Sequence, residues 1–115
     1  EKAQQLIDEA EAKGNQLIAA AEKQAANIRA EAKKRADQLR TEADAKANQL
    51  VSDAGDNFLK KKAAEEGAKK IRSEADKTAG KIEQEADQKA QGLIDQAKQQ
   101  KEKLVEEARQ KAMVK

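Results

Sequence analysis

Leucine or isoleucine recurs every eleven residues along most of the chain. One series of these residues runs from Leu6 to Leu50, and a second runs from Ile71 to Leu104. Each is followed four residues later by alanine, and alanine usually recurs after four more residues. Eleven residues span about three helical turns, so the first, fifth and ninth positions of each block form one narrow apolar stripe. This pattern predicts long α-helices that pair as a coiled coil with a straight or weakly right-handed supercoil.

The residues on and beside the stripe suggest how two such helices meet. Alanine lets the helix backbones approach closely, and the leucine and isoleucine side chains are expected to act as interlocking knobs. The ninth position departs from alanine at Gly14, Phe58 and Lys101. The fourth position is often glutamate and the eighth often basic, a spacing that supports a helix by about 0.3 kcal/mol per pair.

The two series are out of phase by one residue, because Leu50 and Ile71 are one residue short of two full blocks apart. In one continuous helix this slip would rotate the apolar stripe by roughly 100°. The slip falls in the segment 52–57, Ser-Asp-Ala-Gly-Asp-Asn, which is the densest run of turn-forming residues in the chain. We therefore expect the chain to fold back on itself here.

Four residues are expected to build this turn. Gly55 would end the first helix in a left-handed conformation, and Asp56 or Asn57 would cap the second helix. Phe58 would seal the turn against the core of the hairpin.

The predicted fold is all-α: an antiparallel two-helix coiled-coil hairpin that forms a single domain over residues 1–115. Its helices are expected at about residues 3–53 and 57–113, with the turn at about residues 54–56. Two helices that meet along one narrow stripe bury little apolar surface. We therefore expect self-association into a helical bundle or packing on a helical partner.

A fold-back about Gly55 also predicts a register. Leu39 would face Ile71, because the numbers of facing first positions would add up to twice the number of this glycine. The alanine layers would interleave, with Ala32 opposite Ala79. Any two regular arrays give a constant sum, so the informative feature is that the constant coincides with the turn glycine.

The second position of the block is apolar near the open end of the predicted hairpin. The residues concerned are Ile7, Ile18, Ile94 and Val105. The predicted register brings Ile18 near Ile94 and Ile7 near Val105. This strip either widens the seam between the helices or forms an interface for a second copy or a helical partner, with membrane contact less favoured. Our hypothesis is that association occurs through this end.

Nearer the turn the second position is charged. The register places Arg29 beside Glu83 as a cross-helix ion pair, and Arg40 beside Arg72 as like-charged neighbours. The lysines at 60–62 and 69–70 extend this basic face. We expect the face to be solvated and balanced by nearby glutamates, with an anion or acidic-partner site as the alternative.

Charge balance and missing residue types narrow the possible functions. The chain has 24 basic and 22 acidic residues, a net charge of +2 that is too even for a dedicated nucleic-acid binder. It contains no His or Cys, and Ser52 and Ser73 lack a base at any triad spacing. We expect no enzymatic activity, no cofactor and no metal site. No apolar run approaches the ~18 residues of a membrane span.

The segments IRAEAKKRADQLRTEADAKANQL and IEQEADQKAQGLIDQAKQQKEKLVEEA resemble the stalk subunits of rotary ATPases, whose right-handed coiled coils use Ala-rich eleven-residue repeats. They are also similar to late-embryogenesis-abundant proteins, which are largely disordered until dried or lipid-bound. The whole chain resembles uncharacterised bacterial proteins, often associated with the cell envelope, that have two Ala/Glu/Lys-rich repeat arms about a short break. These resemblances transfer no functional residue. They favour the bacterial cell envelope slightly over the cytoplasm and leave open whether a signal or anchor segment precedes Glu1.

The sequence therefore favours a structural or scaffolding coiled-coil protein that acts through helix–helix association. One alternative is an amphipathic protein that protects membranes or dried cells, and another is a stalk-like rod. Leucine or isoleucine at every first position suits a folded seam, and a turn at Gly55 would interrupt a rod.

Overall fold

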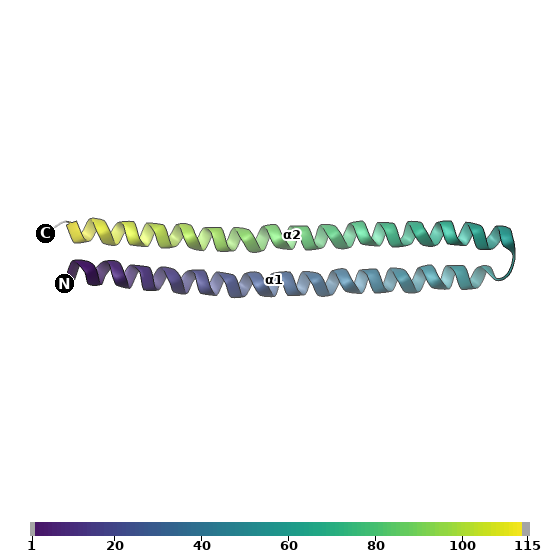
Figure 1. Cartoon of the computed structure of the whole chain (residues 1–115), viewed down its shortest axis with the longest axis horizontal. Helices are drawn as coiled ribbons and strands as arrows, with labels where there is room; N and C mark the ends of the chain where they lie inside the picture. Colours follow the sequence, from purple (N-terminus) through teal and green to yellow (C-terminus); the bar gives the residue numbers. More distant parts are fainter. Residues whose placement is uncertain (1, 114–115) are drawn as a thin grey trace. The chain divides into compact units, whose positions relative to one another are not determined.

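Two helices form nearly the whole of the computed structural model, which describes residues 2–113. Helix α1 spans Lys2–Ala54 and α2 spans Phe58–Met113, joined by the three residues from Gly55 to Asn57 (Figure 1). The predicted all-α helical hairpin is confirmed, with helix bounds within one or two residues of those expected. The terminal residues 1 and 114–115 of the predicted domain lie outside the described part.

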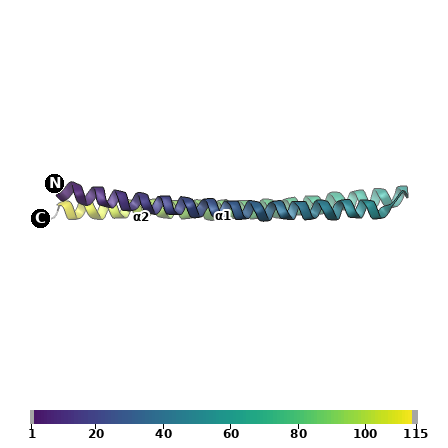
Figure 2. The ribbon, with the colours of Figure 1, turned by 90° about the horizontal axis from the view of Figure 1, so that it is seen from below.

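The chain divides into two compact units, which we describe separately. The turn unit comprises Ala30–Ala86, with the turn between its two helix segments. The terminal unit comprises α1 up to Arg29 and α2 from Asp87 onward. Within each unit the α1 and α2 segments lie side by side and run in opposite directions (Figures 1 and 2).

The turn is built by backbone geometry and one helix cap. Gly55 has a φ of 69°, in the left-handed region where a side chain is strained, and its N–H donates to the carbonyl of Ser52 at 3.2 Å. The side-chain oxygen of Asn57 accepts a hydrogen bond from the N–H of Lys60 at 3.2 Å, three residues into α2. Asn57 therefore caps α2, and its carbonyl accepts the first helical bond, from Lys61.

The core of each unit is a seam of alanine. Six alanines of the seam have 0–1% of their surface exposed, and these are Ala25, Ala36, Ala47, Ala68, Ala79 and Ala90. Most fifth-position alanines are also buried, and Val105 is the one larger buried apolar side chain among the described residues. The leucines and isoleucines that were expected as knobs are only partly buried. They flank the alanines, and Leu6, Leu17 and Leu50 each keep 39% of their surface exposed.

The register also differs from the predicted one. Contacting residues such as Gly14 with Lys101, Arg40 with Asp76, and Leu50 with Gly67 have numbers that add up to 115–117. The seam therefore places Ala79 level with Ala36 rather than with Ala32. Leu39 and Ile71 line one groove beside the seam instead of facing each other across it.

The cause of this shift is the place where α2 begins. With facing residues adding up to about 116, the first residue of α2, Phe58, lies about one helical turn beyond the last residue of α1, Ala54. Figure 1 shows the first turn of α2 reaching past the end of α1. A register centred on Gly55 assumed a symmetric turn, and the turn is asymmetric.

Candidate interaction surfaces

The alanine seam separates two edges, on opposite sides of the fifth and ninth positions of each helix. In the turn unit, a groove on one edge is lined by first-, fourth- and eighth-position residues, which include Leu39, Glu42, Lys46, Ile71, Glu74 and Thr78. A depression on the other edge is lined mainly by second- and sixth-position residues, which include Arg40, Asp44, Arg72 and Asp76. We call these the first edge and the second edge, and we use the same names for the equivalent positions of the terminal unit.

The second edge of the turn unit is closed by ion pairs that cross the seam. Arg40 Nε lies 2.9 Å from Asp76 Oδ1, and its Nη2 lies 3.0 Å from Glu83 Oε1. In the opposite sense, Arg72 Nε lies 2.9 Å from Asp44 Oδ1. Arg40 and Arg72 therefore line one depression, as the sequence suggested, but each is neutralised by a carboxylate of the other helix. The hydrogen bonds that Arg40 donates to Asp76 and to Glu83 raise the pKa of Arg40, so this guanidinium stays charged until strongly alkaline pH.

The predicted ion pair between Arg29 and Glu83 is not formed. Arg29 Nε instead lies 3.0 Å from Asp87 Oδ1, within the terminal unit. The observed register explains why Arg29 has a different partner. Each second-position arginine pairs with a sixth-position aspartate of the other helix, and the two residue numbers add up to 116 in every pair. All these side chains are substantially exposed, so the pairs add little to the stability of the fold.

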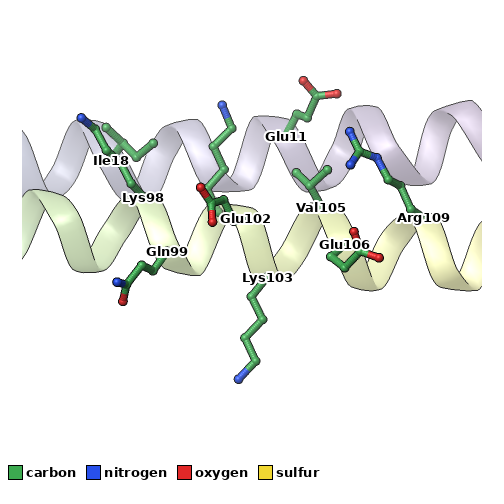
Figure 3. A pocket seen from close by; sticks show the side chains of 10 residues that line it. Glu11, Ile18, Lys98, Gln99, Glu102, Lys103, Val105, Glu106 and Arg109 are labelled. Atoms are coloured by element: carbon green, nitrogen blue, oxygen red, sulfur yellow. The ribbon is translucent and has the colours of Figure 1, made fainter.

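The second edge of the terminal unit contains the four apolar residues predicted as an interface, with charged residues such as Glu11 and Arg109 beside them. Ile7, Ile18 and Ile94 are half-buried, and Val105 is 8% exposed. Figure 3 shows Val105 pointing between the helices, with Arg109 reaching from α2 toward α1. Ile18 shares this depression with Val105 and Glu11, not with Ile94 as the predicted register required. Val105 thus already packs within the hairpin, and the interface role of the four residues stays a prediction.

Gly14 and Lys101, two of the three residues that replace alanine at the ninth position, lie in the same layer of the seam in the terminal unit. Gly14 lies directly under the side chain of Lys101, whose Nζ donates a hydrogen bond to Asn15 Oδ1 at 2.7 Å. A Cβ on Gly14 would lie 2.7 Å from Cβ of Lys101 and 3.1 Å from its Cα, which leaves no room for alanine. The sequence analysis missed this pair, although both residues interrupt the same ninth-position series.

The first edge has a different character in both units. Its leucine and isoleucine side chains are only partly covered, and they are flanked by fourth-position glutamates and eighth-position cations. None of these flanking charges forms an ion pair within residues 2–113. The flanking pairs are Glu9 and Lys13, Glu31 and Arg35, Glu42 and Lys46, Glu85 and Lys89, and Glu107 and Lys111.

Phe58 does not seal the turn, contrary to the sequence expectation. It is 73% exposed and the neighbouring Leu59 is 77% exposed, because the first turn of α2 has no α1 residue beside it. The ammonium of Lys62 lies 5.8 Å from the centre of the Phe58 ring, within the range of a cation–π contact. The tip therefore presents two large apolar side chains next to the lysines at 60–62.

Neither a metal-binding cluster nor a membrane-spanning helix occurs among residues 2–113. Within residues 2–113, no three acidic side chains gather closely enough to hold a metal ion. Neither helix contains a stretch that is both long and apolar enough to cross a membrane, over the residues described. Comparison of the chain with protein-family models, with curated proteins and with solved structures finds no match in any of the three.

Proposed function

We propose that this chain is a non-catalytic structural module that acts by packing its paired helices against other helices. The observation that supports this most directly is the composition of the seam. The fully buried side chains of the described residues are alanines, while the leucines and isoleucines beside them stay partly exposed. Burying a large aliphatic side chain stabilises a fold by about 1.5–3 kcal/mol. Part of the apolar stabilisation available to this sequence is therefore realised only when another surface covers the first edge.

The residue inventory supports the non-catalytic part of the proposal. The sequence contains no His or Cys to act as a base or nucleophile near neutral pH. The surface depressions lie along the edges of a two-helix seam and are open to solvent. The turn at Gly55 supports a hairpin module over a continuous stalk-like rod.

The test is the state of the chain in dilute buffer without lipid. A packing module is expected to be mostly helical by circular dichroism and to unfold cooperatively on heating. A chain that is disordered in buffer and becomes helical only on drying or on lipid addition would overturn the proposal in favour of a desiccation-protective protein.

A second candidate function, contact with an anionic lipid surface, is favoured by the tip of the turn unit. Exposed Phe58 and Leu59 beside the lysines at 60–62 combine an apolar wedge with positive charge. The same stretch also places lysines in the first turn of a helix, where the helix dipole disfavours cations. A locally unfavourable choice of this kind is typical of sites selected for interaction rather than stability.

Vesicle co-sedimentation separates the two candidates. If the tip binds lipid, Phe58→Ser together with Leu59→Ser should abolish binding to vesicles that contain anionic phospholipid. The matched control is Met113→Ser, which removes an equally exposed apolar side chain, 83% accessible, from the other end of α2. Equal binding of both variants, or no binding by the parent chain, would rule out the tip as a lipid site.

A further inference from the structure

In the turn unit, the two edges differ in how their charges are paired. On the second edge, arginines and aspartates pair across the seam, as Arg40 and Asp76 do at 2.9 Å. On the first edge, Glu42 and Lys46 line the same groove as Leu39 and Ile71, and neither charge has an ion-pair partner within residues 2–113. The first edge is thus incompletely paired in both its apolar and its charged residues.

We propose that the first edge is the surface on which a second copy of this chain packs, so that two hairpins form a four-helix arrangement. This inference rests on the proposed function and specifies it, because it names the helices with which the module associates. The partner is argued from spacing and from charge.

The spacing argument concerns the apolar side chains of the first edge. They recur every eleven residues, about 16.5 Å along each helix. An ordinary heptad coiled coil repeats at a different interval and would drift out of step with this edge within a few turns. A second copy has the same interval, so its leucines and isoleucines stay in step with those of the first copy.

The charge argument concerns the four-residue step from glutamate to cation. When two helices run antiparallel with Glu42 opposite Lys46 of a second copy, Lys46 lies opposite Glu42 of that copy. Glu31 with Arg35 is the same kind of step, but it faces itself in a different antiparallel register, with numbers adding up to 66 instead of 88. An intermediate register, with a sum of 77, pairs both steps at once, because Glu42 then lies opposite Arg35 and Glu31 opposite Lys46 of the second copy. Parallel helices in register would instead place like charges opposite each other. The first edge is therefore complementary to itself when the contacting helices are antiparallel.

The second edge provides a matched alternative surface. Its apolar part consists of Ile7, Ile18 and Ile94, with Val105 already buried in the hairpin. In the turn unit, its arginines already pair with carboxylates of the other helix. In the terminal unit, Glu11 and Arg109 beside this edge have no ion-pair partner within residues 2–113. If a second copy used this edge, the exposed leucines of the first edge would remain uncovered.

Two triple variants and sedimentation equilibrium test the proposal. The first-edge variant replaces the three leucines that are 39% exposed, with the substitutions Leu6→Gln, Leu17→Gln and Leu50→Gln. The second-edge variant makes the same kind of change with Ile7→Gln, Ile18→Gln and Ile94→Gln. Circular dichroism of each variant reports whether the helices persist.

The parent chain is expected at twice its monomer mass of 12.6 kDa. The first-edge variant should remain helical and dissociate, with the dimer Kd raised at least about a thousandfold by six lost apolar contacts across the two copies. The second-edge variant should remain a dimer. A parent chain that is helical and monomeric would overturn this inference but leave the proposed function with a different helical partner. Dissociation of the second-edge variant would overturn the assignment of the edge.

Charge exchange gives a second readout that does not remove apolar contacts. The reversal variant carries Glu31→Lys, Glu42→Lys and Glu85→Lys, and it should weaken the dimer by placing cations opposite cations. Adding Arg35→Glu, Lys46→Glu and Lys89→Glu should restore the parent affinity, because the exchanged pattern is again self-complementary. Failure of the second set to restore association would refute the antiparallel charge pairing.

Discussion

Replacing Gly14 by alanine should destabilise the hairpin, although alanine is the better helix former. The new Cβ would lie 2.7 Å from Cβ and 3.1 Å from Cα of Lys101, so the helices must separate locally or the lysine stem must leave the layer. We expect this overpacking to cost about 2 kcal/mol. The higher helix propensity of alanine than of glycine offsets about 1 kcal/mol of this cost. The net loss of unfolding free energy is therefore about 1 kcal/mol.

The effect of Gly14→Ala on the free energy of unfolding should reverse when Lys101 is also replaced by alanine. The layer would then match the one formed by Ala25 and Ala90, both of which are fully buried without a larger neighbour in the layer. In the Lys101→Ala background, Gly14→Ala should stabilise the hairpin by about 1 kcal/mol through helix propensity. The two positions should thus be coupled by about 2 kcal/mol.

Urea and thermal unfolding of the parent chain, the two single variants and the double variant measure this coupling. All four are compared at one protomer concentration, since association shifts apparent stability. For a chain of this length, 1 kcal/mol corresponds to a change in Tm of about 4 °C. A coupling free energy below about 0.3 kcal/mol would show that Gly14 and Lys101 do not share a layer, and it would refute the close approach of the helices there.

Three further predictions follow from the turn unit. Ala36→Leu should cost at least about 2 kcal/mol of unfolding free energy by overpacking the seam, whereas Ala30→Leu on the exposed surface should be neutral in the same melts. Gly55→Ala should lower stability by about 1 kcal/mol because φ is 69°, and Gly80→Ala, with nothing within 4 Å of a new Cβ, should raise it by about as much. Arg40→Gln should lower Tm slightly at low ionic strength, and the difference should vanish in 1 M salt, because the ion pairs are exposed.

The periodic pattern was sufficient to predict both helices and the turn. A one-residue slip in an eleven-residue repeat is compatible with few structures, and the turn-forming residues around Gly55 indicated that the chain folds back there. Helix bounds followed from the absence of proline and the single dense cluster of turn residues. These features are local, so no knowledge of the packing was needed.

The centre of the seam could not be predicted in the same way, because the first, fifth and ninth positions share one stripe. Either the large residues interlock, or the small ones meet and the large ones flank them. The structure adopts the second arrangement, with Ala36 level with Ala79 and Leu39 beside the seam. The predicted partners of Arg29 and Ile18 on the facing helix were also wrong, because a shift in register changes every facing pair at once. The exposure of Phe58 depends on the asymmetric turn, which the sequence does not specify.

A uniform repeat does not by itself determine which residues of the two helices face each other, and Gly14 and Lys101, which interrupt the repeat, help to fix this register. Sliding one helix by eleven residues would again set alanine against alanine, so the seam alone does not define a register. The short turn opposes such a slip, because the loop would have to gain or lose a whole block. The layer of Gly14 and Lys101 opposes it independently, since a slipped Lys101 would lie over the Cβ of Ala25 or of Ala3. The short turn and this layer thus hold the hairpin in one register, while the first edge keeps the regular eleven-residue interval.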